Sequence, residues 1–257
     1  AALRGALPGV VRPVGVALRR VQQRLGGDAA PERARAAHEV AVDEILVAVG
    51  RAPNVEGLGL EAAGVDFDLR RGVRVDDHLR TANRRIYAAG DVCMDWKFTH
   101  AADAAAKIAV QNALFLPTKR LSSLVMPWCT YTDPEVAHVG LSEADAASRG
   151  TPIDSFRVPL HEVNRAVTDG EEEGLVKVHV ARGSDRIVGA TIVAAHAGEM
   201  IGEVSLAIGA KLGLGALLNL IHPYPTQAEG IKRAAAAHAR SRLTPRLARL
   251  LAGWMAL

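Results

Sequence analysis

The stretch LVKVHVARGSDRIVGATIVA, residues 175–194, contains two apolar runs on either side of a short polar segment. In the first run, 175–181, apolar and polar residues alternate, which is typical of a β-strand with one buried face. Residues 182–186, Arg-Gly-Ser-Asp-Arg, have the composition of a turn, and a second β-branched run follows at 187–194. The stretch therefore predicts an antiparallel hairpin.

The residues on either side of this hairpin predict further elements of the same domain. The segment from Ser142 to Arg149 is expected to form a short helix, because Ser142 can cap it and Asp145 stands at the third helical position. We predict further strands over 125–131, 136–140 and 153–158, and helices over 198–211, 213–220 and from 226 towards 240. Together these elements predict an α+β domain with an antiparallel sheet and flanking helices.

The chain before residue 118 has a different pattern. The run VAVDEILVAV, residues 40–49, is short and rich in β-branched residues, which is typical of a strand buried on both faces. Shorter strands are expected over 72–75 and 86–89, and the small apolar residues of 99–115 predict a closely packed helix. We therefore expect a parallel α/β part that ends near residue 117.

The composition fits an ordinary globular protein of two domains. Of the 257 residues, 49% are hydrophobic and 23% are charged, which excludes a disordered, collagen-like or coiled-coil chain. Two cysteines, Cys93 and Cys129, are too few for a disulfide scaffold or a structural zinc cluster, and we predict no resident metal. The sequence contains no run of about 18 uninterrupted apolar residues, so we expect no membrane partner. The small number of cysteines and the lack of an export signal favour a cytoplasmic location.

Basic residues gather at the two ends of the chain. Residues 1–40 hold seven Arg and three acidic residues, and residues 230–257 hold one Lys, five Arg and no acidic residue. A basic segment can bind nucleic acid, but no aromatic residues interleave with these stretches as a single-strand binding surface requires. We therefore expect solvated helix faces here and rank nucleic-acid binding below the other hypotheses.

Four segments taken together resemble a known family. They are VGRAPN (49–54), RTANRRIYAAGDV (80–92), YTDPEVAHVGLSE (131–143) and HPYPTQAEGIKRAA (222–235). In this order and spacing they resemble the pyridine nucleotide-disulfide oxidoreductases, the flavoproteins that include dihydrolipoamide dehydrogenase, glutathione reductase and mercuric reductase. The last segment, together with PWCTYTDPE (127–135), looks most like mercuric-reductase-type members.

The resemblance implies FAD and NAD(P)H as the cofactors of the intact enzyme. The cofactor-binding residues that it implies are Arg51, Gly90, Asp91, Phe98, Thr99 and His100. Asp91 would hydrogen-bond the ribityl chain of FAD, and the helix that starts at 98–100 would point its N-terminal amides at the flavin pyrimidine ring. Arg51 would lie at the joint where the chain returns from the nicotinamide domain to the FAD domain.

The last of these motifs departs from the commonest family pattern. In disulfide-reducing members it reads His-x-His-Pro-Thr, with the second His as the acid-base and a Glu five residues later to orient it. Here Tyr224 occupies the acid-base position and Glu229 the orienting one, while His222 lies two residues upstream. A phenol with a reference pKa of about 10 is a poorer proton shuttle near pH 7 than an imidazole near 6.5. The resemblance implies that the three residues serve the partner subunit's active site, with Tyr224 as a ligand or donor; packing roles are the alternative.

The chain lacks the redox-active Cys-x-x-x-x-Cys motif and both dinucleotide fingerprints of the family. We therefore expect the C-terminal portion of such an enzyme, with weak or absent FAD binding and activity in isolation. The predicted parts are an atypical basic segment at 1–39, the C-terminal part of an FAD-binding domain at 40–117, the interface domain of a homodimer at 118–235 and a basic helical tail at 236–257.

The function that we expect is that of part of an FAD-dependent NAD(P)H oxidoreductase. Electrons would pass from nicotinamide through flavin to a small-molecule acceptor, which is a disulfide, a metal ion or another compound. The second hypothesis is a non-catalytic dimerisation module that retains a remnant of the flavin domain. The third is nucleic-acid binding by the basic termini, for which affinity would fall steeply with salt.

Overall fold

The computed structural model describes residues 43–44 and 46–243 of the chain. The chain divides into two compact units, residues 1–50 and 51–257, and all the helices and strands given below belong to the second unit. No helix in the described residues is long and apolar enough to span a bilayer.

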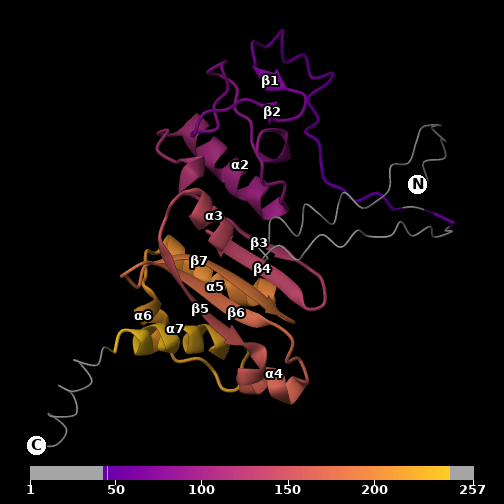
Figure 1. Cartoon of the computed structure of the whole chain (residues 1–257). Helices are drawn as coiled ribbons and strands as arrows, with labels where there is room; N and C mark the ends of the chain where they lie inside the picture. The colour runs from indigo at the N-terminus through magenta and orange to yellow at the C-terminus, as the bar shows by residue number, and fades with distance from the viewer. Residues whose placement is uncertain (1–42, 45, 244–257) are drawn as a thin grey trace, which may run out of the picture. The chain divides into compact units, whose positions relative to one another are not determined.

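A five-stranded antiparallel sheet is the central element of the C-terminal part of this unit. Its strands lie in the order β3-β4-β7-β6-β5 (Figure 1). Their bounds are Pro127–Thr130 for β3, Glu135–Gly140 for β4, Ile153–Pro159 for β5, Leu175–Ala181 for β6 and Ile187–Ala194 for β7. The hairpin predicted over 175–194 is β6 and β7, which pair with Val178 opposite Ala190. The predicted antiparallel sheet with flanking helices is confirmed.

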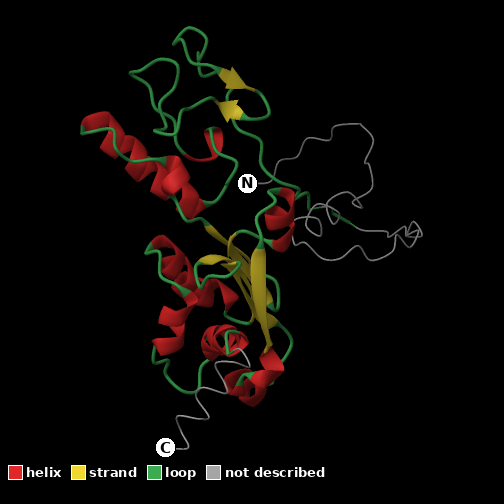
Figure 2. Cartoon of the chain, turned by 60° about the vertical axis from the view of Figure 1, so that its left-hand side comes forward, coloured by secondary structure: helices red, strands yellow, loops and turns green. Residues whose placement is uncertain are grey.

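The alternation of side chains along the strands decides which face of the sheet is covered. Val176, Val178 and Val180 of β6 point to one face, where they are fully buried with Ile192 of β7. The helices that pack on this face are α5 (Ala197–Gly209), α6 (Leu214–Asn219) and α7 (Glu229–Ser241). Figure 2 shows these helices beside the sheet.

Two short helices lie at the ends of strands. The helix α3 (Glu143–Ser148) has the predicted capping box, in which the Ser142 Oγ accepts the Asp145 N–H and the Asp145 carboxylate accepts the Ser142 N–H, each at 3.1 Å. The helix α4 (Asn164–Asp169) follows β5 and ends at Gly170, whose φ of 72° lies in the left-handed region.

The N-terminal part of the unit has few regular elements. Its elements are β1 (Phe67–Asp68), β2 (Gly72–Val73), the 3₁₀ turn η1 (Gly90–Val92), α2 (Thr99–Leu114) and η2 (Leu121–Ser123). The strands β1 and β2 pair antiparallel, and β2 is the shortened form of the strand predicted over 72–75. The helix predicted over 99–115 is confirmed as α2.

Two strand predictions are wrong for the described residues. The segment 86–89 makes only an isolated bridge, Arg80 with Tyr87. Residues 43–44 and 46–49 of the run predicted as a buried strand carry no strand, and Leu46 is 92% exposed. A strand needs a neighbour for its backbone N–H and C=O groups, and these residues lack one in the part of the chain that is described.

The predicted division of the chain into four parts extends beyond the described residues. The basic segment 1–39 lies outside the described residues, as do residues 244–257 of the tail. The helix α7 runs from Glu229 to Ser241 and so continues across the predicted boundary at 235. The division stays a prediction.

The first testable prediction concerns Gly189 of β7. A Cβ atom added at this position would lie 2.1 Å from the backbone oxygen of Leu141. We expect Gly189→Ala to lower the free energy of unfolding by about 3 kcal/mol, because backbone has to move to admit the methyl group. The matched control is Gly202→Ala in α5, where the new Cβ meets nothing within 4 Å. This control should raise stability by about 0.5–1 kcal/mol in urea unfolding; equal losses in the two variants would contradict the close contact.

The second prediction concerns pH and His179 of β6. His179 is 1% exposed, and its Nδ1 lies 2.8 Å from the Ser155 hydroxyl. Burial lowers the pKa of His179 to about 4. The nearby Glu143 carboxylate opposes this shift, whereas Lys177 and His138 add to it. The unfolded chain takes up a proton on this residue below about pH 6.5, whereas the folded chain does so only near pH 4. The contribution of the neutral His179 to the free energy of unfolding is therefore fully present above about pH 6.5 and is lost as the pH falls towards 4.

Urea unfolding at pH 7 and pH 5 measures this effect. The wild-type chain should lose about 2 kcal/mol more between the two pH values than His179→Asn, in which the Asn amide takes the place of Nδ1. The exposed His161 provides the control: we expect His161→Asn to lose as much stability between pH 7 and pH 5 as the wild-type chain does. An unchanged loss in His179→Asn would contradict the prediction.

Candidate functional site

The residues predicted to bind flavin lie around η1 and the start of α2. Asp91 is in η1, and Lys97 fixes this turn because its Nζ donates to the backbone oxygens of Asp91 (2.8 Å) and Met94 (3.1 Å). Arg51 in turn donates through Nη1 to the backbone oxygen of Lys97 at 2.6 Å. The Arg51 Nε lies 3.9 Å from an Asp91 carboxylate oxygen, so the structure brings these two predicted residues together.

Gly90 permits a close approach between η1 and α2. Its φ of +82° lies in the left-handed region, which favours glycine. A Cβ atom at this position would lie 3.0 Å from the Cβ of Ala102 on α2. Both the conformation and the space at position 90 therefore require glycine.

The N-terminus of α2 is open. Its N-cap residue, Phe98, is extended, and no side chain caps the helix that starts at Thr99. The first N–H groups of the helix thus have no side-chain acceptor in the described residues. Phe98 stacks on His100 with ring centroids 5.2 Å apart, and His100 donates through Nε2 to the Pro127 oxygen at 2.9 Å.

These residues fit a flavin. The Asp91 side chain is 43% exposed, so its carboxylate can accept further hydrogen bonds of the kind that ribityl hydroxyls donate. The open N–H groups of α2 suit an electronegative ring edge, because the positive end of the helix dipole favours negative charge there. The described residues thus offer both an acceptor for hydroxyls and donors for ring oxygens.

The two cysteines do not form a redox pair. Both are free thiols, and burial raises the pKa of Cys93 to about 11. Burial and the nearby Glu135 carboxylate raise the pKa of Cys129 as well. Both thiols are therefore protonated near pH 7, whereas the thiolate is the reactive form. Among residues 43–44 and 46–243, no group of three or more His, Cys, Asp or Glu side chains could hold a metal ion.

The predicted acid-base residues lie in the segment between α6 and α7. His222 is held by Glu203 of α5, whose two carboxylate oxygens are 3.1 and 3.2 Å from Nε2. The His222 side chain is only 7% exposed. Glu203 is a residue that sequence reasoning missed, and the available signal was a carboxylate one helical turn after Glu199 in an otherwise apolar helix.

Tyr224 and Glu229 point to different partners. Tyr224 is 73% exposed, and its hydroxyl accepts a hydrogen bond from the Asn164 side-chain amide at 3.0 Å. Glu229 accepts from Arg233 one turn further along α7, at 2.9 and 3.0 Å, and its second oxygen is buried without a partner in the described residues. The structure thus brings His222 together with Glu203, but it does not join Glu229 to Tyr224. The predicted roles of the three residues stay predictions.

Two family models match the chain. The model described as pyridine nucleotide-disulphide oxidoreductase matches residues 18–106. The model of the dimerisation domain of the same oxidoreductases matches residues 126–235. The second range contains the whole five-stranded sheet and its covering helices as far as residue 235.

Curated relatives and solved structures agree with these models. A mercuric reductase of Staphylococcus aureus is 38% identical over 196 residues, which is 76% of this chain and 36% of the relative. A dihydrolipoyl dehydrogenase of Thermus scotoductus is 39% identical over 199 residues, 77% of this chain and 43% of the relative. The structure of the HOCl-induced flavoprotein disulfide reductase RclA from Escherichia coli matches with a TM-score of 0.70 at 27% identity, covering 77% of this chain and 46% of that one.

The match covers only part of the length of each relative. The chain spans 36% and 43% of the lengths of the two relatives named above, so it corresponds to less than half of each. The members of this family are FAD- and NAD(P)H-dependent oxidoreductases. Two models of one family cover most of the chain, and the relatives match at 38–39% identity. The chain therefore belongs to the pyridine nucleotide-disulphide oxidoreductases.

Proposed function

We propose that this chain is part of a cytoplasmic FAD-dependent NAD(P)H oxidoreductase that passes electrons to a small-molecule acceptor. The observation that carries the proposal is the open Asp91 carboxylate on η1, a turn that packs against the first turn of α2, whose N-terminus no side chain caps. Bound FAD supplies the transfer of electrons between nicotinamide and the acceptor. The acceptor is a disulfide, a metal ion or another small compound.

The residues around η1 bind and orient the cofactor. Asp91 accepts hydrogen bonds from the ribityl hydroxyls, and Arg51 and Lys97 fix the turn that carries it. Gly90 lets this turn lie against α2, so the Asp91 carboxylate and the N-terminus of α2 bind the same ligand. The first N–H groups of α2 donate to the flavin ring edge.

The segment 222–229 serves the site of the partner subunit. Tyr224 presents its hydroxyl as a donor or ligand for the acceptor, since the side chain is 73% exposed. His222 is fixed by Glu203 and holds the segment against α5. Glu229 anchors the first turn of α7, behind this segment, through Arg233.

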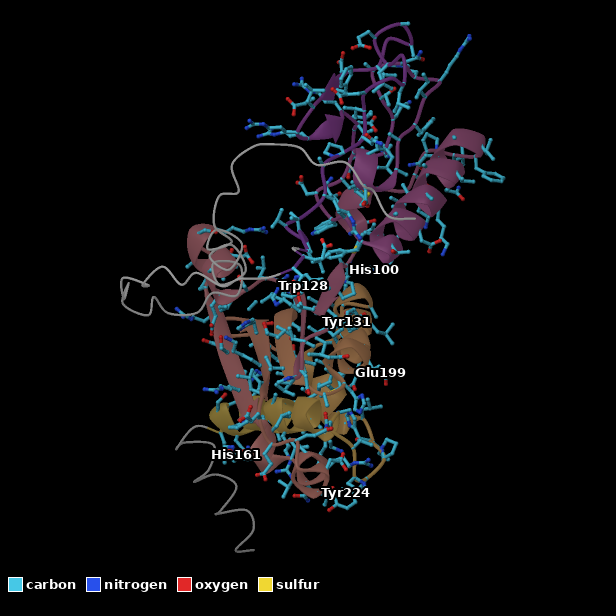
Figure 3. All side chains as sticks on the ribbon, turned by 90° about the vertical axis from the view of Figure 1, so that its right-hand side faces the viewer. His100, Trp128, Tyr131, His161, Glu199 and Tyr224 are labelled. Carbon is cyan, nitrogen blue, oxygen red and sulfur yellow. The ribbon has the colours of Figure 1, made fainter. Side chains whose placement is uncertain are left out.

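A homodimer is supported by exposed apolar side chains on the matched dimerisation domain. Tyr131 is 80% exposed, Leu206 of α5 is 70% exposed and Ile221 is 87% exposed. Figure 3 shows Tyr131, Glu199 and Tyr224 on one side of this domain. Exposed apolar surface of this kind is typical of a protein interface.

Flavin binding tests the proposal through Asp91. We expect Asp91→Asn to weaken FAD binding at least about tenfold, because a charged acceptor of ribityl hydroxyls becomes a neutral amide. The matched control is Asp95→Asn, which removes an exposed carboxylate four residues away. Quenching of flavin fluorescence on titration of FAD with the purified chain measures both variants.

The outcomes of this titration separate the two leading hypotheses. Equal weakening by the two substitutions would contradict a specific role for Asp91. A chain that forms a dimer but never binds FAD, even at high micromolar concentration, would favour the non-catalytic dimerisation module. Steep salt dependence of binding to DNA or RNA would instead favour the nucleic-acid hypothesis.

Dimerisation is tested separately through Leu206. We expect the wild-type chain to sediment as a dimer at micromolar concentration and Leu206→Glu to shift it to monomer, because a buried, unpaired carboxylate is costly at an interface. The control Leu114→Glu changes a leucine of α2 that is 74% exposed and should leave the dimer intact. A monomeric wild-type chain, or a dimer that survives Leu206→Glu, would contradict the interface at α5.

A further inference from the structure

A cavity of about 690 Å³ lies between β2, the residues that follow η1 and the start of η2. Val73 and Met94 line it and are only 6% and 3% exposed, and the other apolar lining residues include Val75, Cys93 and Leu121. Ligand sites have volumes of about 300–1,000 Å³ and combine an apolar lining with a few polar groups. None of the residues predicted from the sequence to bind flavin or to act as acid-base lines this cavity. The space therefore suits a small organic ligand that the proposed electron transfer does not account for.

Two arginines of the lining have no partner for their guanidinium groups. Arg71 and Arg74 stand on either side of β2, are exposed, and make no side-chain hydrogen bond or ion pair within the described residues. The pKa of the Asp68 carboxyl is lowered by the backbone N–H groups of Arg71 and Arg70 and, to a smaller extent, by the charges of Arg71 and Arg74. Both guanidinium groups thus lie near one carboxylate, so they are close enough together to bind one anion.

The carboxylates around the cavity are engaged, with one exception. Asp76 accepts hydrogen bonds from two backbone N–H groups, at 2.9 and 3.0 Å, and from one guanidinium at 3.4 Å. Asp77 accepts from the N–H and the hydroxyl of Ser122, at 2.8 and 2.7 Å. Asp68, outside the lining, accepts from two backbone N–H groups at 2.8 Å. Asp95 is the one lining carboxylate without a partner in the described part of the chain. Two unpaired guanidinium groups against one unpaired carboxylate favour an anionic ligand.

Trp96 gives the cavity a flat apolar surface. It belongs to the lining and is 41% exposed, so part of its indole is open to a ligand. Aromatic rings stack on one another in offset or edge-to-face arrangements. The loop that carries the indole is held by Lys97, whose Nζ donates to the backbone oxygen of Met94 at 3.1 Å. The cavity thus offers a surface for a ring beside donors for an anion.

We propose that this cavity binds a small aromatic anion, a planar ring that carries a carboxylate or a phosphate. The ring lies against Trp96 and on the side chains of Val73 and Met94, and the anionic group accepts hydrogen bonds from Arg71 and Arg74. The ligand is either an aromatic carboxylate or a mononucleotide, since both have this chemistry. This binding goes beyond the proposed electron transfer and requires no flavin.

Isothermal titration calorimetry with four probes tests the proposal on the full chain without flavin. The aromatic anions are indole-3-acetate and AMP, the uncharged analogue is indole-3-ethanol, and acetate is the anion without a ring. We expect at least one aromatic anion to bind with a Kd below about 1 mM, and the alcohol and acetate to bind at least about tenfold more weakly. Tighter binding of AMP than of indole-3-acetate identifies a nucleotide, and the reverse identifies an aromatic carboxylate. Absence of binding by both aromatic anions, or equal binding of the alcohol or of acetate, would overturn the proposal.

A pair of charge-matched variants separates the cavity from general attraction. We expect Arg74→Gln to weaken binding of the aromatic anion about tenfold and to leave urea unfolding unchanged, because this guanidinium has no partner in the described residues. Arg84→Gln removes one exposed arginine outside the lining and should change the Kd less than twofold. Equal weakening in the two variants would show attraction to net charge alone and would overturn the site. Because no step of this test involves FAD, its failure is distinguishable from failure of the oxidoreductase proposal.

Discussion

The apolar face of the five-stranded sheet has to be removed from water, and this requirement determines where the rest of the dimerisation domain lies. The side chains of Val176, Val178, Val180 and Ile192 are fully buried, and each contributes about 1.5–3 kcal/mol when it is covered. The cover comes from α5 and α7, which pack on the same face. The loops that join these helices are consequently held at fixed places, although they have little regular structure of their own.

The position of α5 has the largest consequence for function. Its inner side carries Ile201 and Val204 into the core, so its outer side has to present Glu199, Glu203 and Leu206. Glu203 then holds His222 at 3.1 Å and fixes the segment that leads to Tyr224. One helix, oriented by apolar packing, thus shapes both the proposed interface and the segment next to the predicted acid-base position.

The sequence predicted those elements whose information is local. The hairpin at 175–194 and the capping box of Ser142 and Asp145 follow from neighbours within a few residues, and both are confirmed. The strands expected over 86–89 and in the described part of 40–49 are wrong, because strand formation depends on partner strands elsewhere in the chain. Glu203 could not be paired with His222 from the sequence, since the two residues are joined only by tertiary packing.

The surroundings of Tyr224 bear on which chemistry a phenol can carry out at this position. The Asn164 amide donates to the phenol oxygen, so the O–H of Tyr224 remains free to donate to a ligand. To act as a general base, Tyr224 would first have to give its own proton to a neighbouring group, so that the phenolate could take up another. Neither Glu229 nor His222 hydrogen-bonds the Tyr224 hydroxyl in the described residues, because Glu229 is engaged with Arg233 and His222 with Glu203. The exposed phenol is therefore better suited to hold an acceptor than to move protons in thiol–disulfide exchange, which agrees with the departure of this motif from the His-x-His-Pro-Thr pattern.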